Sequence, residues 1–197
     1  MKIYDISQEV FSCSVYPGDP IPERKELLSV EKGDVCNLTE LKMCAHNGTH
    51  IDAPYHFLSD GMKIDELPLE KLIGYALVVE HRGEVSCADA EQFVNIARSV
   101  QIKCVNKILI KGDATVTYEA SRVFAKEGID LIGNESQTVG PPDAPKQVHI
   151  ELLRANVVLL EGIRLSDVPE GVYLLNAAPL NLGGSDGSPC RAVLIDL

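Results

Sequence analysis

The sequence has little positive charge and no long hydrophobic run. Its 18 basic residues stand against 29 acidic ones, for a net charge of −11, and the basic residues form no stripe. Nucleic acid and anionic membranes are bound through clustered Lys and Arg, so neither is expected as a partner. No apolar run approaches the roughly 20 residues of a membrane span, and the first residues lack the pattern of a signal peptide. We therefore expect a cytoplasmic protein.

Closely spaced cysteine pairs are also missing. The six cysteines lie at positions 13, 36, 44, 87, 104 and 190, and none forms a C-x-x-C pair. This spacing suits neither a structural zinc knuckle nor a small disulfide scaffold. We interpret the cysteines as reduced and mostly buried thiols.

The chain has no internal repeat, low-complexity tract or linker. At 197 residues it is long enough for one substantial core, and 45% hydrophobic with 24% charged residues is an ordinary globular composition. We predict one domain over residues 1–197.

Short apolar runs alternate with helical patterns along this domain. The alternation of residues 39–43 predicts a half-buried strand, and aliphatic, β-branched runs predict strands at 3–6, 76–79, 108–110, 157–160, 172–175 and 192–195. Helices are predicted over residues 90–100, behind a capping box of Ser86 and Asp89, and over 118–126, with a shorter one following His149. Strands that alternate with helices indicate an α/β fold, with a mixed β-sheet flanked by helices.

Histidines concentrate in one short segment. Three of the five fall between residues 46 and 56, in His-Asn-Gly-Thr-His-Ile-Asp-Ala-Pro-Tyr-His. His46, His50 and His56, together with Asp52, are residue types that bind transition metals. A solvated polar turn is the alternative interpretation.

A metal site would require this segment to bend. Fully extended, His46 and His56 would lie about 33 Å apart at ~3.3 Å per residue, whereas ligands of one centre converge to bonds of roughly 2 Å. Gly48 permits a sharp turn, and Pro54 fixes a kink. Both residues disfavour a helix, so this is not the H-E-x-x-H arrangement of a zinc helix.

The string H-x-G-T-H-x-D-A-P-x-H resembles the signature of the metal-dependent cyclase or kynurenine formamidase-like hydrolases. Further similarity covers nearly the whole chain: residues 16–20 resemble the family's W-P-G-D-x-P, residues 128–133 resemble the segment before a substrate-side loop, and residues 179–192 resemble its closing P-L…D-G-A-P-x-R-A. The resemblance implies a swivelling β/β/α-like fold, a metal-dependent amidohydrolase and a homo-oligomer, dimeric or higher.

The same resemblance implies a histidine and a glutamate twelve residues apart, here His149 and Glu161. His46 and His50 would bind one metal and His149 the other, with Asp52 and Glu161 bridging both. Glu161 follows an apolar run, where a buried carboxylate needs a partner. The resemblance thus implies two metal ions per chain, and the ligand types favour Zn²⁺, with Mn²⁺ as the alternative.

In this scheme His56 is left as the general acid–base. A water held at the metal would lose a proton near neutral pH and attack, and His56 would relay that proton to the departing amine. Thr49 would orient a ligand or make a structural hydrogen bond.

The substrate implied is an aryl formamide such as N-formylkynurenine, which would place the enzyme in tryptophan catabolism. Tyr16, where the family has tryptophan, is expected to bind the substrate by stacking on its ring. Residues 134–138 differ from the D-x-P-S of many formamidases. Hydrolysis or dehydrating cyclisation of a cyclic amide or other small substrate is the alternative, as is a non-catalytic metal- or ligand-binding module.

Overall fold

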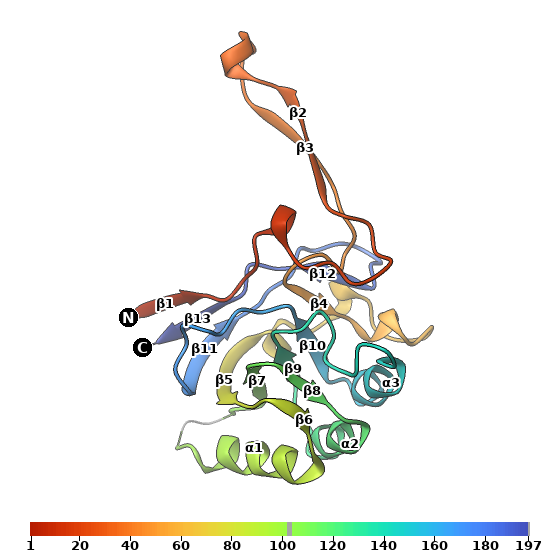
Figure 1. Ribbon diagram of the computed structural model, residues 1–197, viewed down its shortest axis with the longest axis vertical. Helices are drawn as coiled ribbons and strands as arrows, with labels where there is room; N and C mark the ends of the chain where they lie inside the picture. Colours follow the sequence, from red (N-terminus) through yellow and green to blue (C-terminus); the bar gives the residue numbers. More distant parts are fainter. Residues whose placement is uncertain (102–103, 197) are drawn as a thin grey trace.

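The structure is a computed structural model that describes residues 1–101 and 104–196. In this part of the chain, three α-helices pack on a curled nine-stranded mixed sheet (Figure 1). In spatial order the strands are β1 (Lys2–Asp5), β13 (Val193–Asp196), β11 (Gly171–Asn176), β5 (Ile73–Glu80), β7 (Lys107–Lys111), β9 (Leu131–Asn134), β10 (Val158–Glu161), β4 (His50–Asp52) and β12 (Gly187–Pro189). The predicted α/β fold with a mixed sheet flanked by helices is confirmed.

Smaller elements complete the described residues. Two short pairs of strands are β2 (Glu23–Leu28) with β3 (Leu38–Lys42), and β6 (Gly83–Val85) with β8 (Ala114–Val116). The α-helices are α1 (Cys87–Ser99), α2 (Tyr118–Lys126) and α3 (Lys146–Arg154). Single 3-10 turns occupy Val10–Ser12, Val30–Lys32, Pro54–His56, Ile64–Glu66 and Leu69–Lys71.

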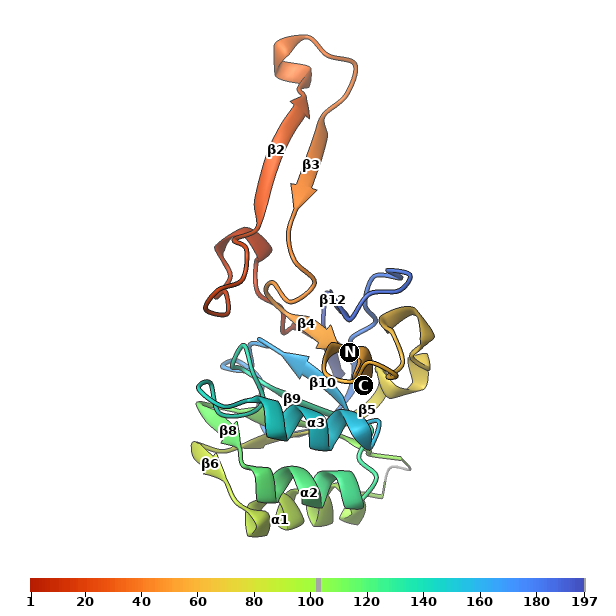
Figure 2. The same cartoon turned by 90° about the vertical axis from the view of Figure 1, so that its right-hand side faces the viewer.

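The four parallel strands β5, β7, β9 and β10 form the middle of the sheet and are buried on both faces. Their side chains alternate between two cores, so that Ile108 packs toward the helices and Leu109 toward the opposite face. Figure 2 shows α1, α2 and α3 stacked along one side of this sheet. Burial on both faces explains why these strands are continuous apolar runs in the sequence.

The helices begin where the sequence predicts, with one exception. Ser86 and Asp89 form the expected capping box of α1, and the Thr117 hydroxyl accepts the amide of Ala120 to cap α2. The third helix, however, begins at Lys146 and contains His149, whereas the sequence placed it after that histidine. The physical reason lies in Pro145, whose φ of −71° suits a helix start and whose carbonyl accepts the His149 amide.

The predicted half-buried strand at residues 39–43 is a strand, but it is not half-buried. All five residues of β3 are exposed, because β3 pairs with β2 in a ribbon that projects far from the main sheet (Figures 1 and 2).

The cysteines also differ from the prediction of mostly buried thiols. Cys36, Cys87 and Cys104 are exposed, since they lie beyond the ribbon's tip turn, in the first turn of α1 and in the loop before β7.

The two ends of the described chain lie side by side. Strand β1 pairs antiparallel with β13, so the sheet edge is built from both termini (Figure 1). None of the helices among the described residues has the length and apolar character needed to cross a lipid bilayer.

Candidate metal centre

The histidine-rich segment bends back on itself, as the sequence predicts. Gly48 has a φ of +71°, which glycine adopts without strain, and Pro54 opens a 3-10 turn that ends at His56. Strand β4 lies between these two bends. The ring centroids of His46 and His56 are consequently only 4.1 Å apart.

The register of the sheet places two carboxylates, those of Asp52 and Glu161, beside these histidines. Strand β4 lies between β10 and β12, and His50 is the antiparallel partner of Glu161, the last residue of β10. Asp52 lies on the same face of β4 as His50, since side chains two residues apart in a strand share a face. His149 reaches the same point from α3.

The five predicted metal ligands lie together in two overlapping groups. His46, His50 and Asp52 form one, and Asp52, His149 and Glu161 form the other, with the candidate ligand atoms of each group within 4.8 Å of one another. His50 Nε2 lies 3.4 Å from Asp52 and 3.5 Å from Glu161, while His149 Nε2 lies 3.6 Å from Asp52 and 3.1 Å from Glu161. Both carboxylates are thus shared by the two histidines.

Backbone carbonyls orient two of these imidazoles. His50 Nδ1 donates to the Gly48 carbonyl at 3.0 Å, and His149 Nδ1 donates to the Pro145 carbonyl at 2.9 Å. Since a carbonyl can only accept, the Nδ1 atom of each ring carries hydrogen, and Nε2 is directed toward the carboxylates. Metal-binding histidines are held in this way by an acceptor on the outer nitrogen. The donor set fits a divalent cation.

The electrostatics also favour positive charge at this point. Asp52 is 1% exposed and Glu161 is 2% exposed, so their charges require a buried partner. Burial alone would lower the pKa of His50, but hydrogen bonds to Asp52 and Glu161 raise it to about 10. Burial likewise opposes a raised pKa for His149, and Glu161 overcomes it. Protons on imidazoles or a divalent cation would each neutralise the cluster.

Four of the five candidate ligands, all except Asp52, line a cavity of about 250 Å³. Its lining combines aromatic and apolar side chains with polar ones. The lining residues are Tyr16, Asp19, His46, His50, His56, Phe57, Gln137, Thr138, Pro145, His149 and Glu161. The structure therefore brings Tyr16 and His56 to the same cavity as the candidate ligands. Tyr16 is half-buried there, and its hydroxyl donates to the carbonyl of Pro142 at 3.1 Å.

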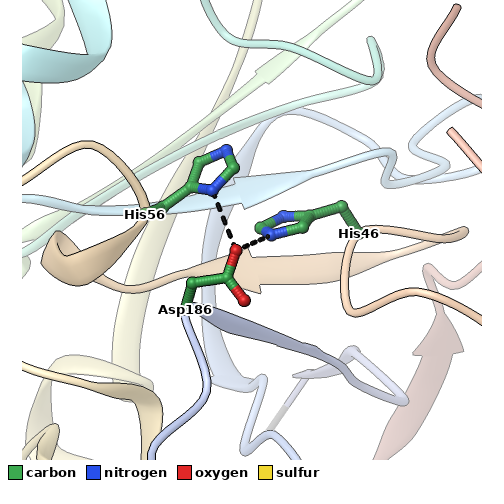
Figure 3. A group of neighbouring side chains, drawn as sticks. All are labelled: His46, His56 and Asp186. Atoms are coloured by element: carbon green, nitrogen blue, oxygen red, sulfur yellow. Dashed lines mark hydrogen bonds and ion pairs between the residues drawn. The ribbon is translucent and has the colours of Figure 1, made fainter. Parts of the chain in front are cut away.

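Asp186 also belongs to this site, and the sequence analysis gave it no role. Its Oδ2 atom lies 2.9 Å from His46 Nε2 and 3.1 Å from His56 Nδ1 (Figure 3). The match of its Asp-Gly-Ser-Pro segment to the family's closing motif could have identified Asp186 as a candidate site residue. Gly187 permits the approach, because a Cβ there would lie 2.7 Å from His46 Cε1.

Charges around His46 follow from these contacts. Burial alone would lower the pKa of His46, but Asp186 and Asp52 raise it to about 10. In turn, the hydrogen bond from His46 holds the pKa of Asp186 well below its usual range. Thr49, by contrast, bonds backbone groups: its hydroxyl donates to the Gly162 carbonyl and accepts the amide of Gln8. Of the two roles expected for Thr49, these contacts favour the structural hydrogen bond over the orientation of a metal ligand.

Known proteins resemble this chain along nearly its full length. The model of the cyclase family, described as "Putative cyclase", matches residues 4–141. A kynurenine formamidase from Salinibacter ruber is 34% identical over 100% of this chain and 98% of its own length. A solved structure titled as a potential metal-dependent hydrolase with cyclase activity is 28% identical, with a TM-score of 0.81 over 98% of this chain and 96% of its own. Isatin hydrolase A from Labrenzia aggregata shares the fold, with a TM-score of 0.84 at 20% identity over 98% of this chain and 93% of its own.

Proposed function

The chain belongs to the cyclase family, and from this membership and its site we propose that it hydrolyses the C–N bond of an aryl formamide. The resemblance inferred from the sequence is confirmed, as is the prediction of a hydrolytic enzyme of this family. One observation carries the proposal. The buried carboxylates of Asp52 and Glu161 are shared between the Nε2 atoms of His50 and His149, and His50, His149 and Glu161 line a cavity.

His46, His50, Asp52, His149 and Glu161 are the proposed metal ligands, and the carboxylates of Asp52 and Glu161 would help to hold both of the two expected ions. Zinc is the proposed metal and manganese the alternative, because nitrogen and oxygen ligands suit both. A divalent cation held there would supply a water with a pKa lowered to about 7 and would polarise a carbonyl oxygen. The chain's own contribution is a ligand set shielded from solvent, since His50, Asp52, His149 and Glu161 are all buried.

His56 is the proposed general acid–base. Its side chain lines the cavity and is 28% exposed, so it can reach a substrate while remaining ordered by Asp186 and by Phe57, whose ring lies 4.6 Å away edge-on. With Nδ1 held by Asp186, Nε2 is the nitrogen that can take a proton from the attacking water and deliver it to the departing amine. The products are formate and the free aryl amine.

The cavity wall supports an aromatic substrate. Tyr16, Phe57 and Pro145 offer apolar surface on which a planar ring can stack, while Gln137 and Thr138 offer polar groups. N-formylkynurenine has an aryl ring next to the scissile formamide, so it is the proposed substrate. A cyclic amide is the second candidate, because Tyr16 replaces the family's tryptophan and residues 134–138 depart from the formamidase loop.

Tyr16→Ala is expected to lower kcat/KM for N-formylkynurenine about tenfold. Loss of an aromatic contact costs on the order of 0.5–1.5 kcal/mol beyond burial, and ~1.4 kcal/mol corresponds to one decade. Tyr16→Trp is expected to keep or improve the value. Tyr16→Phe is the matched control for the hydroxyl, because it keeps the ring and removes the hydrogen bond to Pro142. Steady-state kinetics on N-formylkynurenine, a lactam and an ester measure all three variants.

Two results would contradict this assignment in different ways. Equal kcat/KM in wild type, Tyr16→Ala and Tyr16→Trp would remove Tyr16 from the substrate site. Turnover of the lactam without turnover of any aryl formamide would favour the cyclic-amide alternative. A protein that binds metal and turns over none of the panel would favour the non-catalytic module.

We also propose that residues 1–197 form one catalytic domain of a cytoplasmic homo-oligomer, with the β2–β3 ribbon as its interface. The alternation of β3 predicts a covered face that contains Leu41, yet Leu41 is 60% exposed in the single chain. An isolated two-stranded ribbon is marginally stable in water. Residues 23–42 carry four basic and five acidic side chains, so their charges nearly cancel. Contact between two copies through this ribbon therefore adds little electrostatic repulsion, although each chain as a whole is acidic.

Leu41→Lys is expected to weaken self-association at least tenfold. Burial of a leucine contributes about 1.5–3 kcal/mol, which is one decade or more in the dissociation constant. Glu40→Lys is the control, since it adds a lysine on the opposite face of the same strand. Light scattering across a dilution series measures both. A wild-type protein that is monomeric at every concentration, or equal weakening by both variants, would contradict the proposed interface.

A further inference from the structure

We propose that Asp186 is a positioning residue that holds the imidazoles of His46 and His56 in the orientation and tautomer that the reaction needs. This inference rests on the proposed function, because it concerns the same site. Asp186 would act through the two histidines, and it is not one of the proposed metal ligands. Its carboxylate contacts both His46, a proposed metal ligand, and His56, the proposed general acid–base (Figure 3).

The first part of the argument concerns His46. The outer nitrogens of His50 and His149 are each held by a backbone carbonyl. His46 follows the same pattern with a carboxylate as acceptor: its Nε2 atom lies 2.9 Å from Asp186, and its Nδ1 atom faces Asp52 at 2.8 Å. A proton kept at Nε2 leaves Nδ1 with its lone pair toward Asp52, where a cation would be bound. An acceptor on the outer nitrogen fixes both ring orientation and tautomer.

The second part concerns His56. Its Nδ1 atom lies 3.1 Å from the same oxygen of Asp186. An ionised carboxylate only accepts hydrogen bonds, so Nδ1 carries hydrogen and Nε2 is left for proton exchange in the cavity. The His46 ring is tilted only 30° from that of His56 at a centroid distance of 4.1 Å. One carboxylate therefore fixes two neighbouring rings, as a third group orients the base in other hydrolases.

The loop before β12 holds Asp186 in place by contacts on both sides. The Asp186 carbonyl accepts the amide of Ala53, next to the metal-binding strand, and the Ser185 carbonyl accepts the amide of Ile64. Asp65 accepts the amide of Gly184 at 2.8 Å. The Asp186 side chain itself is 42% exposed. Because its backbone is anchored independently of its carboxylate, the side chain can be changed while the loop is retained.

The test compares Asp186→Ala and Asp186→Asn with Asp65→Ala, in full-length zinc-loaded protein labelled with ¹⁵N-histidine. Asp65→Ala removes a carboxylate that anchors the same loop and leaves Asp186 intact. Long-range ¹H–¹⁵N spectra report which nitrogen of each ring carries hydrogen, and the chain's five histidines keep them simple. We expect the His46 and His56 nitrogen signals to change in Asp186→Ala, to change less in Asp186→Asn, and to stay as in wild type in Asp65→Ala.

Two further measurements separate positioning from a structural role. Zinc affinity, measured by chelator competition, is expected to fall about 10–100-fold in Asp186→Ala, the usual range for an outer partner of a metal ligand. At saturating zinc, kcat is expected to fall by a similar factor, with KM nearly unchanged. In a His56→Ala background at saturating zinc, the same replacement should lower kcat by no more than about twofold, since the part of its effect that does not act on zinc binding passes through His56.

Unchanged histidine spectra in Asp186→Ala, equal changes in Asp65→Ala, or fully additive losses in the double variant would overturn the proposal. The spectra and the zinc affinity need no substrate. If the protein hydrolyses no formamide while both measurements respond as expected, the proposed function fails and the positioning role stands. If the protein hydrolyses the formamide while neither the histidine spectra nor the zinc affinity changes, the proposed function stands and the positioning role fails.

Discussion

Replacing His50 by alanine is expected to remove the metal and the activity together, whereas His56→Ala should keep the metal and lower turnover roughly 10²–10⁴-fold, the usual range for a general acid–base. The structure gives these two histidines different surroundings. His50 is 1% exposed with Nε2 between Asp52 and Glu161, so its loss leaves both buried carboxylates short of a partner. His56 contacts Asp186 and faces the cavity.

Elemental analysis and steady-state kinetics on the same preparations measure this difference. His81→Ala is the matched control, because His81 bonds the Glu84 carbonyl in a turn away from the cavity. It should keep both metal and activity. If His56→Ala loses its metal as His50→Ala does, then His56 is a ligand and the proton relay must be assigned to another group.

Removal of the metal is expected to abolish activity and to lower the melting temperature on the order of 5–10 °C. A ligand at 100 times its dissociation constant stabilises the folded state by about 2.7 kcal/mol, and each kcal/mol shifts the melting temperature of a chain this size by about 2–4 °C. The physical cause is the pair of buried carboxylates, which lose the cation and keep only protonated imidazoles as compensating charge. Purified protein should carry up to two divalent ions per chain.

Calorimetry before and after chelation, with elemental analysis of the unstripped protein, measures this effect. Glu161→Gln is an informative comparison, since it keeps an acceptor for the Val139 amide and removes one buried charge. Its melting temperature should respond less to the chelator than that of wild type. Protein without stoichiometric metal that stays fully active after chelation would contradict the metal dependence.

Local patterns in the sequence were enough to predict the α/β class and two of the three helices found among the described residues. Ser86 with Asp89 and Thr117 cap α1 and α2 through contacts three residues apart, so their effect is visible in a short window of sequence. The bend of the histidine-rich segment was also predictable, because Gly48 and Pro54 restrict the backbone locally. The start of α3 at Lys146 was missed, since Pro145 alone does not distinguish a turn from a helix start.

The sequence by itself determined which side chains are candidates for the chemistry: histidines and an aspartate in one bent segment, and a glutamate ending a buried run. Only the tertiary structure decided how they meet. The antiparallel register of β4 with β10 places His50 opposite Glu161, and the β12 loop delivers Asp186 from 140 residues beyond His46. The exposure of the β2–β3 ribbon was likewise decided only by the tertiary structure. Register and long-range packing depend on every contact across a sheet at once, whereas caps, turns and strand alternation depend on a few neighbouring residues.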